Sequence, residues 1–307
     1  MSSPPEGVQQ DFPLARLTTV RTGGSADWFA RPAEEESLVA ALRWADSEGL
    51  PVGVIGSGSN LLVADDGFHG LAIKLDGELA EIEREGERVI CGGGYRFPSA
   101  AAKTAGWGLS GLEFGVNIPG TAGGAVRMNA NAYGGQLARV LEWVDVCTAQ
   151  GTERRGPDQL GFEYRRSNLK PGEIVARASF HLKGADPEEI KATLAGMRER
   201  RREAQPSGIK TFGSTFKNPE SAEGAPTEGR SSGQLLEAAG CRGLRHGGVR
   251  FSEKHANFVE NDRDGTTADV LELMAEGRRR VHERFGVVLE PEVQILGEVE
   301  WPRGWDL

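Results

Sequence analysis

The chain has 307 residues, of which 38% are hydrophobic and 26% are charged, so it can bury a large core, and a disordered or fibrous protein is excluded. It carries 45 acidic and 36 basic residues, and the formal charge of -9 disfavours general binding to the phosphates of DNA or RNA. Glycine is the outlier: 43 residues, about 14% of the chain, occur without the every-third-residue period of collagen. These glycines need a local explanation.

The cysteines and the N-terminus indicate a protein of the cytoplasm that has no membrane association. Cys91, Cys147 and Cys241 are odd in number and far apart, which favours reduced thiols over a disulfide framework or paired zinc ligands. The first residues show no basic stretch followed by an apolar run, and nowhere does the chain reach the ~18 consecutive apolar residues of a membrane span.

Mixed α and β structure is predicted along the first two thirds of the chain. Apolar residues at helical spacing predict a helix over 34–48. Between 88 and 135, glycines interrupt the chain every few residues, and only a short helix at 124–129 is expected there. Short apolar or alternating runs predict strands at 51–55, 71–75, 141–149 and 174–183.

A further α and β region is predicted near the C-terminus. An Asp-Pro-Glu-Glu start and a basic end predict a helix over 186–205, and we interpret its final arginines as a solvated helix end rather than a nucleic-acid patch. Pro206 and the Gly-, Pro- and Ser-rich stretch 219–233 indicate a domain boundary with a long loop, and this loop is a candidate lid. Helices are predicted at 232–239 and 266–285, and strands at 257–260 and 287–296.

Two glycine-rich loops are candidates for phosphate binding. Gly56-Ser57-Gly58-Ser59-Asn60 follows a predicted strand, where backbone amides without Cβ crowding can point at phosphate oxygens. Leu61 and a following strand exclude the dinucleotide fingerprint. The second loop contains Gly120, Thr121, Gly123 and Gly124 and opens a short helix. Together the loops predict a diphosphate ligand. The alternative explanation is a tight turn for the first loop and close glycine packing between elements for the second.

Three other motifs carry polar side chains. Arg165 and Arg166 precede a turn and can bind a carboxylate as a fork, although paired arginines are often simply solvated. The segment 213–219 places Ser214 after a glycine, but phenylalanines on both sides exclude the nucleophile elbow of hydrolases, and a surface turn is the alternative. Glu292 belongs to a Glu-Pro-Glu sequence that would otherwise be a solvated strand edge.

Seven segments, taken in order, resemble the UDP-N-acetylenolpyruvoylglucosamine reductase family, and they span nearly the whole chain. They are Thr19-Val20-Arg21-Thr22-Gly23-Gly24; Gly56-Ser57-Gly58-Ser59-Asn60-Leu61-Leu62; Gly111-Leu112-Glu113-Phe114 with the 118–130 loop and helix; Tyr164-Arg165; Gly213-Ser214-Thr215-Phe216-Lys217-Asn218-Pro219; His255-Ala256-Asn257-Phe258; and Glu290-Pro291-Glu292-Val293. The compact stretch 141–183 points to the shorter branch of this family.

The resemblance implies an α+β fold: a two-subdomain FAD-binding fold of the vanillyl-alcohol-oxidase (PCMH) type plus an α+β substrate-binding domain. The implied boundaries are 1–75 for the first FAD-binding subdomain, joined by 297–307, then 76–205 for the second and 206–296 for the substrate domain. The family places the FAD diphosphate against loops that match 56–60 and 120–124. Non-covalent FAD is expected, because related oxidases often attach the flavin to a loop histidine and only His69 lies between 56 and 135.

The family's reaction implies a role for each matching residue. NADPH reduces FAD, and a hydride from the flavin N5 then reaches C3 of UDP-N-acetylglucosamine enolpyruvate, giving UDP-N-acetylmuramate for peptidoglycan synthesis. Arg165 would hold the substrate carboxylate and stabilise the enolate, Glu292 would assist at that carboxylate, and Ser214 would protonate C2. The residues expected to bind the nucleotide sugar are Lys217, Asn218 and Arg242. We expect a monomer without a metal.

Charge supports the proposed substrate region, whereas one residue departs from the family pattern. Residues 206–257 carry seven basic and five acidic side chains, a balance of +2 in an acidic protein, which favours a dianionic nucleotide sugar. Asn131 stands where many family members have glycine, and the sequence offers no explanation beyond the tolerance of asparagine for a left-handed backbone. Two alternatives are a flavin oxidase that acts on an alcohol or hydroxy acid, and a nucleotide-sugar-binding module without redox chemistry.

Overall fold

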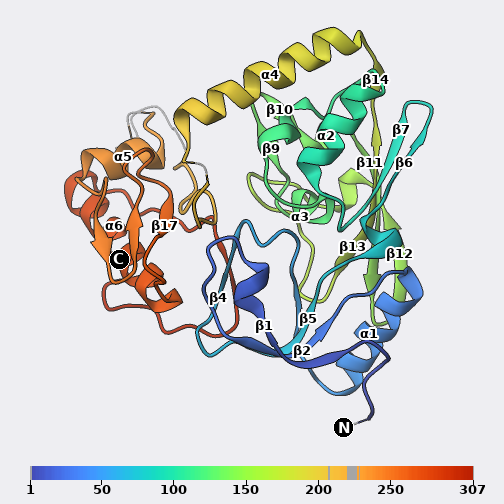
Figure 1. Cartoon of the computed structure of the whole chain (residues 1–307), viewed down its shortest axis with the longest axis horizontal. Coiled ribbons are helices and arrows are strands. Elements are labelled where there is room, and N and C mark those ends of the chain that lie inside the picture. The colour runs from blue at the N-terminus through green and yellow to red at the C-terminus, as the bar shows by residue number, and fades with distance from the viewer. Residues whose placement is uncertain (1, 207, 220–226, 228, 307) are drawn as a thin grey trace. The chain divides into compact units, whose positions relative to one another are not determined.

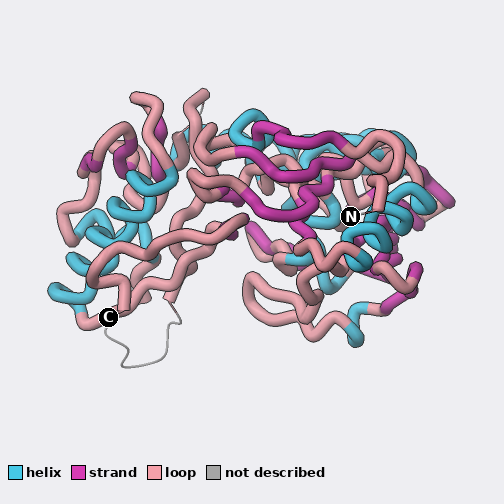
Figure 2. The backbone as a smooth tube through the Cα atoms, turned by 90° about the horizontal axis from the view of Figure 1, so that it is seen from below, coloured by secondary structure: helices cyan, strands magenta, loops and turns pink. Residues whose placement is uncertain are grey.

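A computed structural model describes residues 2–206, 208–219, 227 and 229–306, which form two compact units. Unit 1 comprises 1–12, 26–57 and 69–201, and unit 2 comprises 13–25, 58–68 and 202–307. Both units mix helices with short strands, and Figure 2 shows that much of the chain is loop. The α+β character expected from the sequence is therefore present in each unit.

The units and the predicted domains divide the chain differently. Most of the two predicted FAD-binding subdomains lies in unit 1, and the final boundary at 201/202 falls close to the predicted one at 205/206. Residues 58–68 and 297–307 belong together in unit 2. The division of 1–205 into two subdomains, with 297–307 joining the first, stays a prediction. Nothing in the sequence indicated that two short N-terminal stretches belong with the C-terminal third.

A four-stranded sheet and helix α1 (Glu35–Ser47) build the first part of unit 1. The strand order is β1 (Gln9–Pro13), β2 (Ser25–Ala30), β5 (Phe68–Ile73) and β3 (Val52–Val54), with β3 and β5 parallel. Helix α1 begins where Ser37 Oγ accepts the Glu34 N–H at 3.2 Å, and Gly49 follows its end with a left-handed φ of 67°. These local signals confirm the predicted helix at 34–48.

A five-stranded antiparallel sheet forms the centre of unit 1 (Figure 1). Helix α1 packs against one face, where Ile174 and Ala176 are buried, whereas Ala178 belongs to the core on the other face under α2 (Phe97–Gly106) and α3 (Ala122–Arg127). The strand that contains these residues, 174–181, has a register shift: Asp145 pairs with Arg177, but Val146 pairs with Val175. This irregularity moves the even-numbered side chains after residue 176 to the other face of the sheet. The strands are, in order, β12 (Gly151–Arg155), β11 (Leu141–Thr148), β13 (Ile174–His181), β7 (Arg88–Gly92) and β6 (Ile82–Glu85).

Helix α2 and several short elements of unit 1 were not predicted. An alanine-rich stretch with Pro98 in its first turn is a recognisable helix signal, but the many glycines around it obscured that signal. Helix α3 lies two residues before the expected 124–129. The remaining short elements are β8 (Leu109–Ser110) with β14 (Lys183–Gly184), β9 (Asn131–Ala132) with β10 (Gly135–Gln136), and 3-10 turns at Gly77–Ala80, Glu113–Asn117, Leu137–Arg139 and Pro157–Gln159.

Helix α4 (Pro187–Ala204) confirms the predicted helix at 186–205, but its basic end is not wholly solvated. Arg201 is half-buried, and its guanidinium donates a hydrogen bond to the backbone oxygen of Asn117. Burial lowers the pKa of Arg201. This arginine therefore attaches the helix to the 3-10 turn that precedes the second glycine-rich loop, which corrects the interpretation of the whole run as a solvated end.

Unit 2 packs two helices against a small sheet. Helix α6 (Thr267–Phe285) confirms the predicted 266–285 helix: Thr266 Oγ1 accepts the Asp269 N–H at 3.1 Å, and Gly286 ends the helix with a φ of 67°. Its core cluster contains buried side chains from both helices, including Leu235 and Met274. The other elements are a 3-10 turn (Leu14–Leu17), α5 (Ser232–Ala238), and an antiparallel sheet of β15 (Arg245–His246), β16 (Val249–Phe251) and β17 (Val259–Asn261).

The predicted strand at 287–296 is mostly loop. Only β18 (Gln294–Leu296) is a strand, and it pairs in parallel with β4 (Leu61–Val63), an element that the sequence did not predict. Pro291 lacks a backbone N–H and makes only an isolated bridge to Phe216. The three cysteines are free thiols, as expected, and all three are buried.

Candidate functional site

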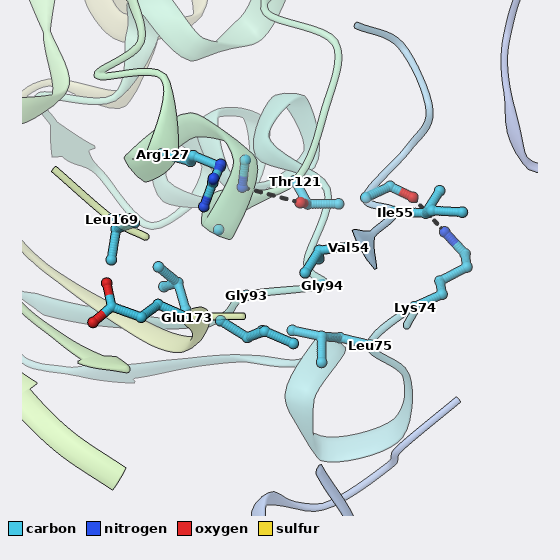
Figure 3. A pocket seen from close by; sticks show the side chains of 15 residues that line it. Val54, Ile55, Lys74, Leu75, Gly93, Gly94, Thr121, Arg127, Leu169 and Glu173 are labelled. Carbon is cyan, nitrogen blue, oxygen red and sulfur yellow. Dashed lines mark hydrogen bonds between the residues drawn. The ribbon is translucent and has the colours of Figure 1, made fainter. Parts of the chain in front are cut away.

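A cavity of about 100 Å³ in unit 1 lies where the glycine-rich segments meet (Figure 3). A Cβ on Gly56 would lie 2.8 Å from Thr121 Oγ1, and a Cβ on Gly93 would lie 1.9 Å from the Val175 backbone oxygen. Such approaches require glycine, so the start of the first predicted phosphate loop and the second loop contact each other at this cavity. The apolar part of its lining comes from Val54, Ile55, Leu75, Leu169, Ile174 and Val175.

Three charged side chains line the same cavity. Lys74 Nζ donates to the Gly56 backbone oxygen at 2.5 Å, and burial is the main reason why its pKa is lowered. The Glu173 carboxylate accepts hydrogen bonds at 2.8 Å from Arg155 and from a backbone amide, and the Arg155 bond lowers its pKa. Arg127 lines the cavity from α3, and none of the described residues gives its guanidinium a hydrogen bond or an ion pair.

The first glycine-rich loop is divided between the two units. Gly56 and Ser57 belong to unit 1, whereas Gly58, Ser59 and Asn60 belong to unit 2. Gly58 has a φ of 64°, and a Cβ there would lie 1.9 Å from the Leu17 backbone oxygen. Close packing thus explains the glycine at 58, whereas Gly56 lines a cavity.

The second loop turns sharply into α3. Gly120 has a φ of 144°, which glycine adopts readily, and Thr121 Oγ1 then accepts the Gly124 N–H at 3.3 Å. Gly123 and Gly124 follow in the first turn and line the cavity. The glycines therefore let the backbone itself form one wall.

Arg165 occupies a tight turn of unit 1 and is held by Asn131. Glu163 and Arg166 exchange backbone hydrogen bonds of 3.0 and 3.3 Å, and Arg165 between them has a φ of 56°, an uncommon conformation for a long side chain. Arg165 Nη1 donates to the backbone oxygen of Asn131 at 3.1 Å and to its Oδ1 at 2.9 Å. The asparagine that departs from the family pattern is thus an acceptor for the predicted catalytic guanidinium. Arg166, in contrast, is exposed and pairs with Glu163 at 3.0 Å.

Ser214, Glu292 and Asn60 come together within unit 2. Ser214 forms an antiparallel bridge with Phe258, which belongs to another of the matching motifs. On the other side, the Glu292 N–H donates to the Thr215 backbone oxygen at 2.9 Å. Asn60 Nδ2 donates to the Glu292 backbone oxygen at 3.1 Å. Backbone pairing therefore fixes the predicted proton donor beside the predicted acid and beside the end of the first glycine-rich loop.

The predicted nucleotide-sugar residues already have partners in unit 2. Lys217 Nζ lies 3.2 Å from Glu290, and Arg242 Nη2 lies 2.6 Å from Glu237. Asn218 Oδ1 accepts a backbone N–H at the start of α5 at 3.1 Å. Ion pairs with at least one largely exposed partner, as here, contribute little free energy. The predicted lid at 219–233 falls largely outside the described residues, because 220–226 and 228 are not among them.

The described residues contain no group of three or more His, Cys, Asp and Glu side chains placed to hold a metal ion. Among the helices of the same residues, none combines the length and the apolar character that crossing a bilayer would require.

Comparison with known proteins gives matches over nearly the whole chain. Residues 26–156 match the family model described as FAD binding domain, and residues 205–296 match the one described as UDP-N-acetylenolpyruvoylglucosamine reductase, C-terminal domain. A UDP-N-acetylenolpyruvoylglucosamine reductase of Rubrobacter xylanophilus is 43% identical over 94% of this chain and 95% of its own length. One from Symbiobacterium thermophilum is 42% identical over 97% and 94%, respectively.

A solved structure agrees with the sequence matches. The crystal structure of the UDP-N-acetylenolpyruvylglucosamine reductase from Thermus caldophilus superimposes with a TM-score of 0.80 at 36% sequence identity, covering 96% of this chain and 99% of that one. The expected α+β fold with an FAD-binding domain is thereby confirmed.

Proposed function

The chain belongs to the UDP-N-acetylenolpyruvoylglucosamine reductase family, and from this premise we propose that it uses NADPH to convert UDP-N-acetylglucosamine enolpyruvate into UDP-N-acetylmuramate. It is an FAD-dependent oxidoreductase of peptidoglycan precursor synthesis. The observation that carries the proposal is the identity with full-length reductases over nearly the whole chain. The three buried, free thiols agree with a reaction in the reducing cytoplasm.

The cavity of unit 1 fits part of a non-covalently bound FAD. At Gly56 and Gly93 the backbone itself forms the cavity wall, because a Cβ at either position would clash with a neighbouring atom. A volume of about 100 Å³ suits a phosphate group with its surroundings rather than a whole dinucleotide. The residues of unit 1 that would hold the FAD diphosphate are Gly56, Ser57, Gly120, Thr121, Gly123 and Gly124. The family resemblance also assigns Gly58, Ser59 and Asn60 to the diphosphate; they belong to unit 2, and their role stays a prediction. When bound, FAD supplies the hydride transfer from NADPH to the substrate.

Arg165 supplies the positive charge that the reaction needs. Hydride addition at C3 leaves negative charge on C2 and on the adjoining carboxylate of the enolpyruvyl group, and a guanidinium held against that carboxylate stabilises the charge as it develops. The left-handed turn and the two hydrogen bonds to Asn131 restrict the motion of the Arg165 side chain before substrate arrives. A pre-oriented cation costs less reorganisation in the transition state.

Ser214 donates the proton to C2, and Glu292 assists at the substrate carboxylate. A serine hydroxyl is a weak acid at neutral pH, so it serves as donor only to a strongly basic carbon within hydrogen-bond reach. The backbone bonds through Phe258 and Thr215 keep the Ser214 segment beside Glu292. Lys217, Asn218 and Arg242 then bind the diphosphate part of the substrate in exchange for their present partners.

Anaerobic half-reactions test this function. NADPH should bleach the visible absorbance of the bound flavin, and the enolpyruvyl nucleotide sugar should restore it. A protein that binds no FAD, or a reduced flavin that the substrate does not reoxidise, would refute the proposal. Steady oxygen consumption with an alcohol or hydroxy acid would favour an oxidase instead.

Ser214→Ala isolates the proton donor. We expect reduction by NADPH to keep its rate, while reoxidation by the substrate slows by about 10²- to 10⁴-fold, the usual contribution of a general acid. Ser47→Ala is the control, because Ser47 is exposed and its hydroxyl donates within its own helix turn, to the Trp44 backbone oxygen. Equal reoxidation rates in the two variants would exclude Ser214 as the donor.

A further inference from the structure

Arg127 is a cation in the cavity of unit 1 that no described residue neutralises through a hydrogen bond or ion pair. It follows the second glycine-rich loop directly, at the last position of α3, and Figure 3 shows its side chain on the cavity side of that helix. The residue is half-buried. Burial lowers its pKa, and the charge of Glu173 opposes that effect only in part.

The neighbouring charges do not satisfy this guanidinium. Lys74 donates to the Gly56 backbone oxygen, and the Glu173 carboxylate is already bonded to Arg155 and to a backbone amide. Arginine stays charged at any physiological pH, so it cannot escape the cost of desolvation by losing its proton. A half-buried guanidinium without a partner is therefore costly to the free protein, and an anion that enters the cavity would remove that cost.

The surroundings favour a phosphate group as that anion. The glycines place backbone along part of the cavity wall, and Lys74 adds a second positive charge, so that the lining carries two cations against the one carboxylate of Glu173. A guanidinium binds phosphate through two parallel N–H bonds, which gives both affinity and orientation. Both Gly56 and Arg127 fall within the part of the chain that matches an FAD-binding domain, which makes FAD a better source of the phosphate than the nucleotide sugar.

We propose that Arg127 binds a phosphate group of the FAD diphosphate, an assignment that rests on the proposed flavoenzyme function. Arg127 is then a cofactor-binding residue that the sequence motifs did not single out, because they pointed to the glycines of the loop and not to the helix that follows. Its side chain adds a charge-assisted hydrogen bond to the backbone contacts.

Reconstitution of the FAD-free protein tests the assignment without an activity assay. The dissociation constants of FAD and of riboflavin, which has no phosphate, are measured by flavin fluorescence for the wild type, Arg127→Met and Arg127→Lys. Methionine keeps the apolar stem of the side chain and removes the charge. Arg139→Met, at an exposed arginine of the same domain, is the matched control. Thermal unfolding of each FAD-free variant shows that it is folded.

We expect Arg127→Met to weaken FAD binding by about 10- to 100-fold, the range for one hydrogen bond to a charged group, and to leave riboflavin binding unchanged. Arg127→Lys should recover most of the affinity for FAD. Equal weakening for FAD and riboflavin would assign Arg127 to packing and overturn the inference, as would an unchanged affinity for FAD. Weaker binding of UDP to the FAD-loaded variant, with FAD binding intact, would also overturn it, since the phosphate would then be the substrate's.

The two proposals fail in different ways. A wild-type protein that binds no FAD contradicts the proposed function itself. A wild type that binds FAD, together with an Arg127→Met variant that binds it equally well, contradicts only the role of Arg127.

Discussion

Gly93→Ala should disrupt the wall of the cavity and the sheet behind it. An added Cβ would lie 1.9 Å from the Val175 backbone oxygen, whereas ordinary contacts begin at 3.4 Å, so the two backbone segments must separate by about 1.5 Å. Two hydrogen bonds connect Gly93 to its surroundings, from its own N–H to the Ala176 oxygen at 2.7 Å and from the Gly123 N–H to the Gly93 oxygen at 2.9 Å. Separation would stretch at least the first of them.

The expected loss is a substantial fraction of the stability of a typical domain, ~5–15 kcal/mol. Overpacking of a tight site costs ~1–3 kcal/mol, and each weakened backbone hydrogen bond adds ~0.5–1.5 kcal/mol. We therefore expect Gly93→Ala to lower the free energy of unfolding by about 3 kcal/mol and to reduce FAD retention, because Gly93 and Gly123 both line the cavity. Urea titration and the flavin content of the purified protein measure the two effects.

Gly196→Ala is the matched control. Gly196 lies inside α4, and a Cβ there would meet no atom within 4 Å. Alanine has the higher helix propensity, so the control should gain about 1 kcal/mol and keep its flavin. If Gly93→Ala is as stable as the wild type and retains FAD equally, the close approach inferred from the structure is wrong.

Two further predictions concern polar contacts. Asn131→Gly removes the Oδ1 acceptor of Arg165 and should raise KM for the enolpyruvyl substrate several-fold without changing flavin reduction by NADPH. Asn131→Asp keeps an acceptor and should recover the KM. An unaltered KM in the glycine variant would show that Asn131 does not position Arg165. Glu142 accepts two hydrogen bonds of 2.6 Å from Arg88, and these lower its pKa to about 2 from the usual 4.5. Since the folded-state pKa is depressed, the stabilisation is complete above pH 4.5 and is lost as the pH falls towards 2. Glu142→Gln should therefore cost about 1 kcal/mol at pH 7 in urea titrations, after allowance for solvent screening, and the difference from wild type should shrink below pH 4.5. A difference independent of pH would contradict this assignment.

Local signals determined the long helices. Helices α1, α4 and α6 follow from apolar spacing and from capping residues, such as Thr266 and Gly286, that act within a few positions of the helix end. Such signals are complete within one segment of sequence, because a cap satisfies backbone groups of its own first or last turn. The same holds for the glycine-rich loops, whose order along the chain also identified the family.

Only the tertiary structure decided which segments meet. The sequence did not predict β4, and it predicted a strand over 287–296 of which only β18 forms; the two short strands supply hydrogen-bond partners to each other from distant parts of the chain. The bond between Asn131 and Arg165 likewise joins residues whose relation no local pattern shows. The roles of site side chains depend on such pairings. The sequence thus determined the long helices, the glycine-rich loops and the motifs of the reductase family. Tertiary contacts decided that Arg201 is held by the Asn117 backbone and that Arg127 faces a cavity where no described residue bonds to its guanidinium.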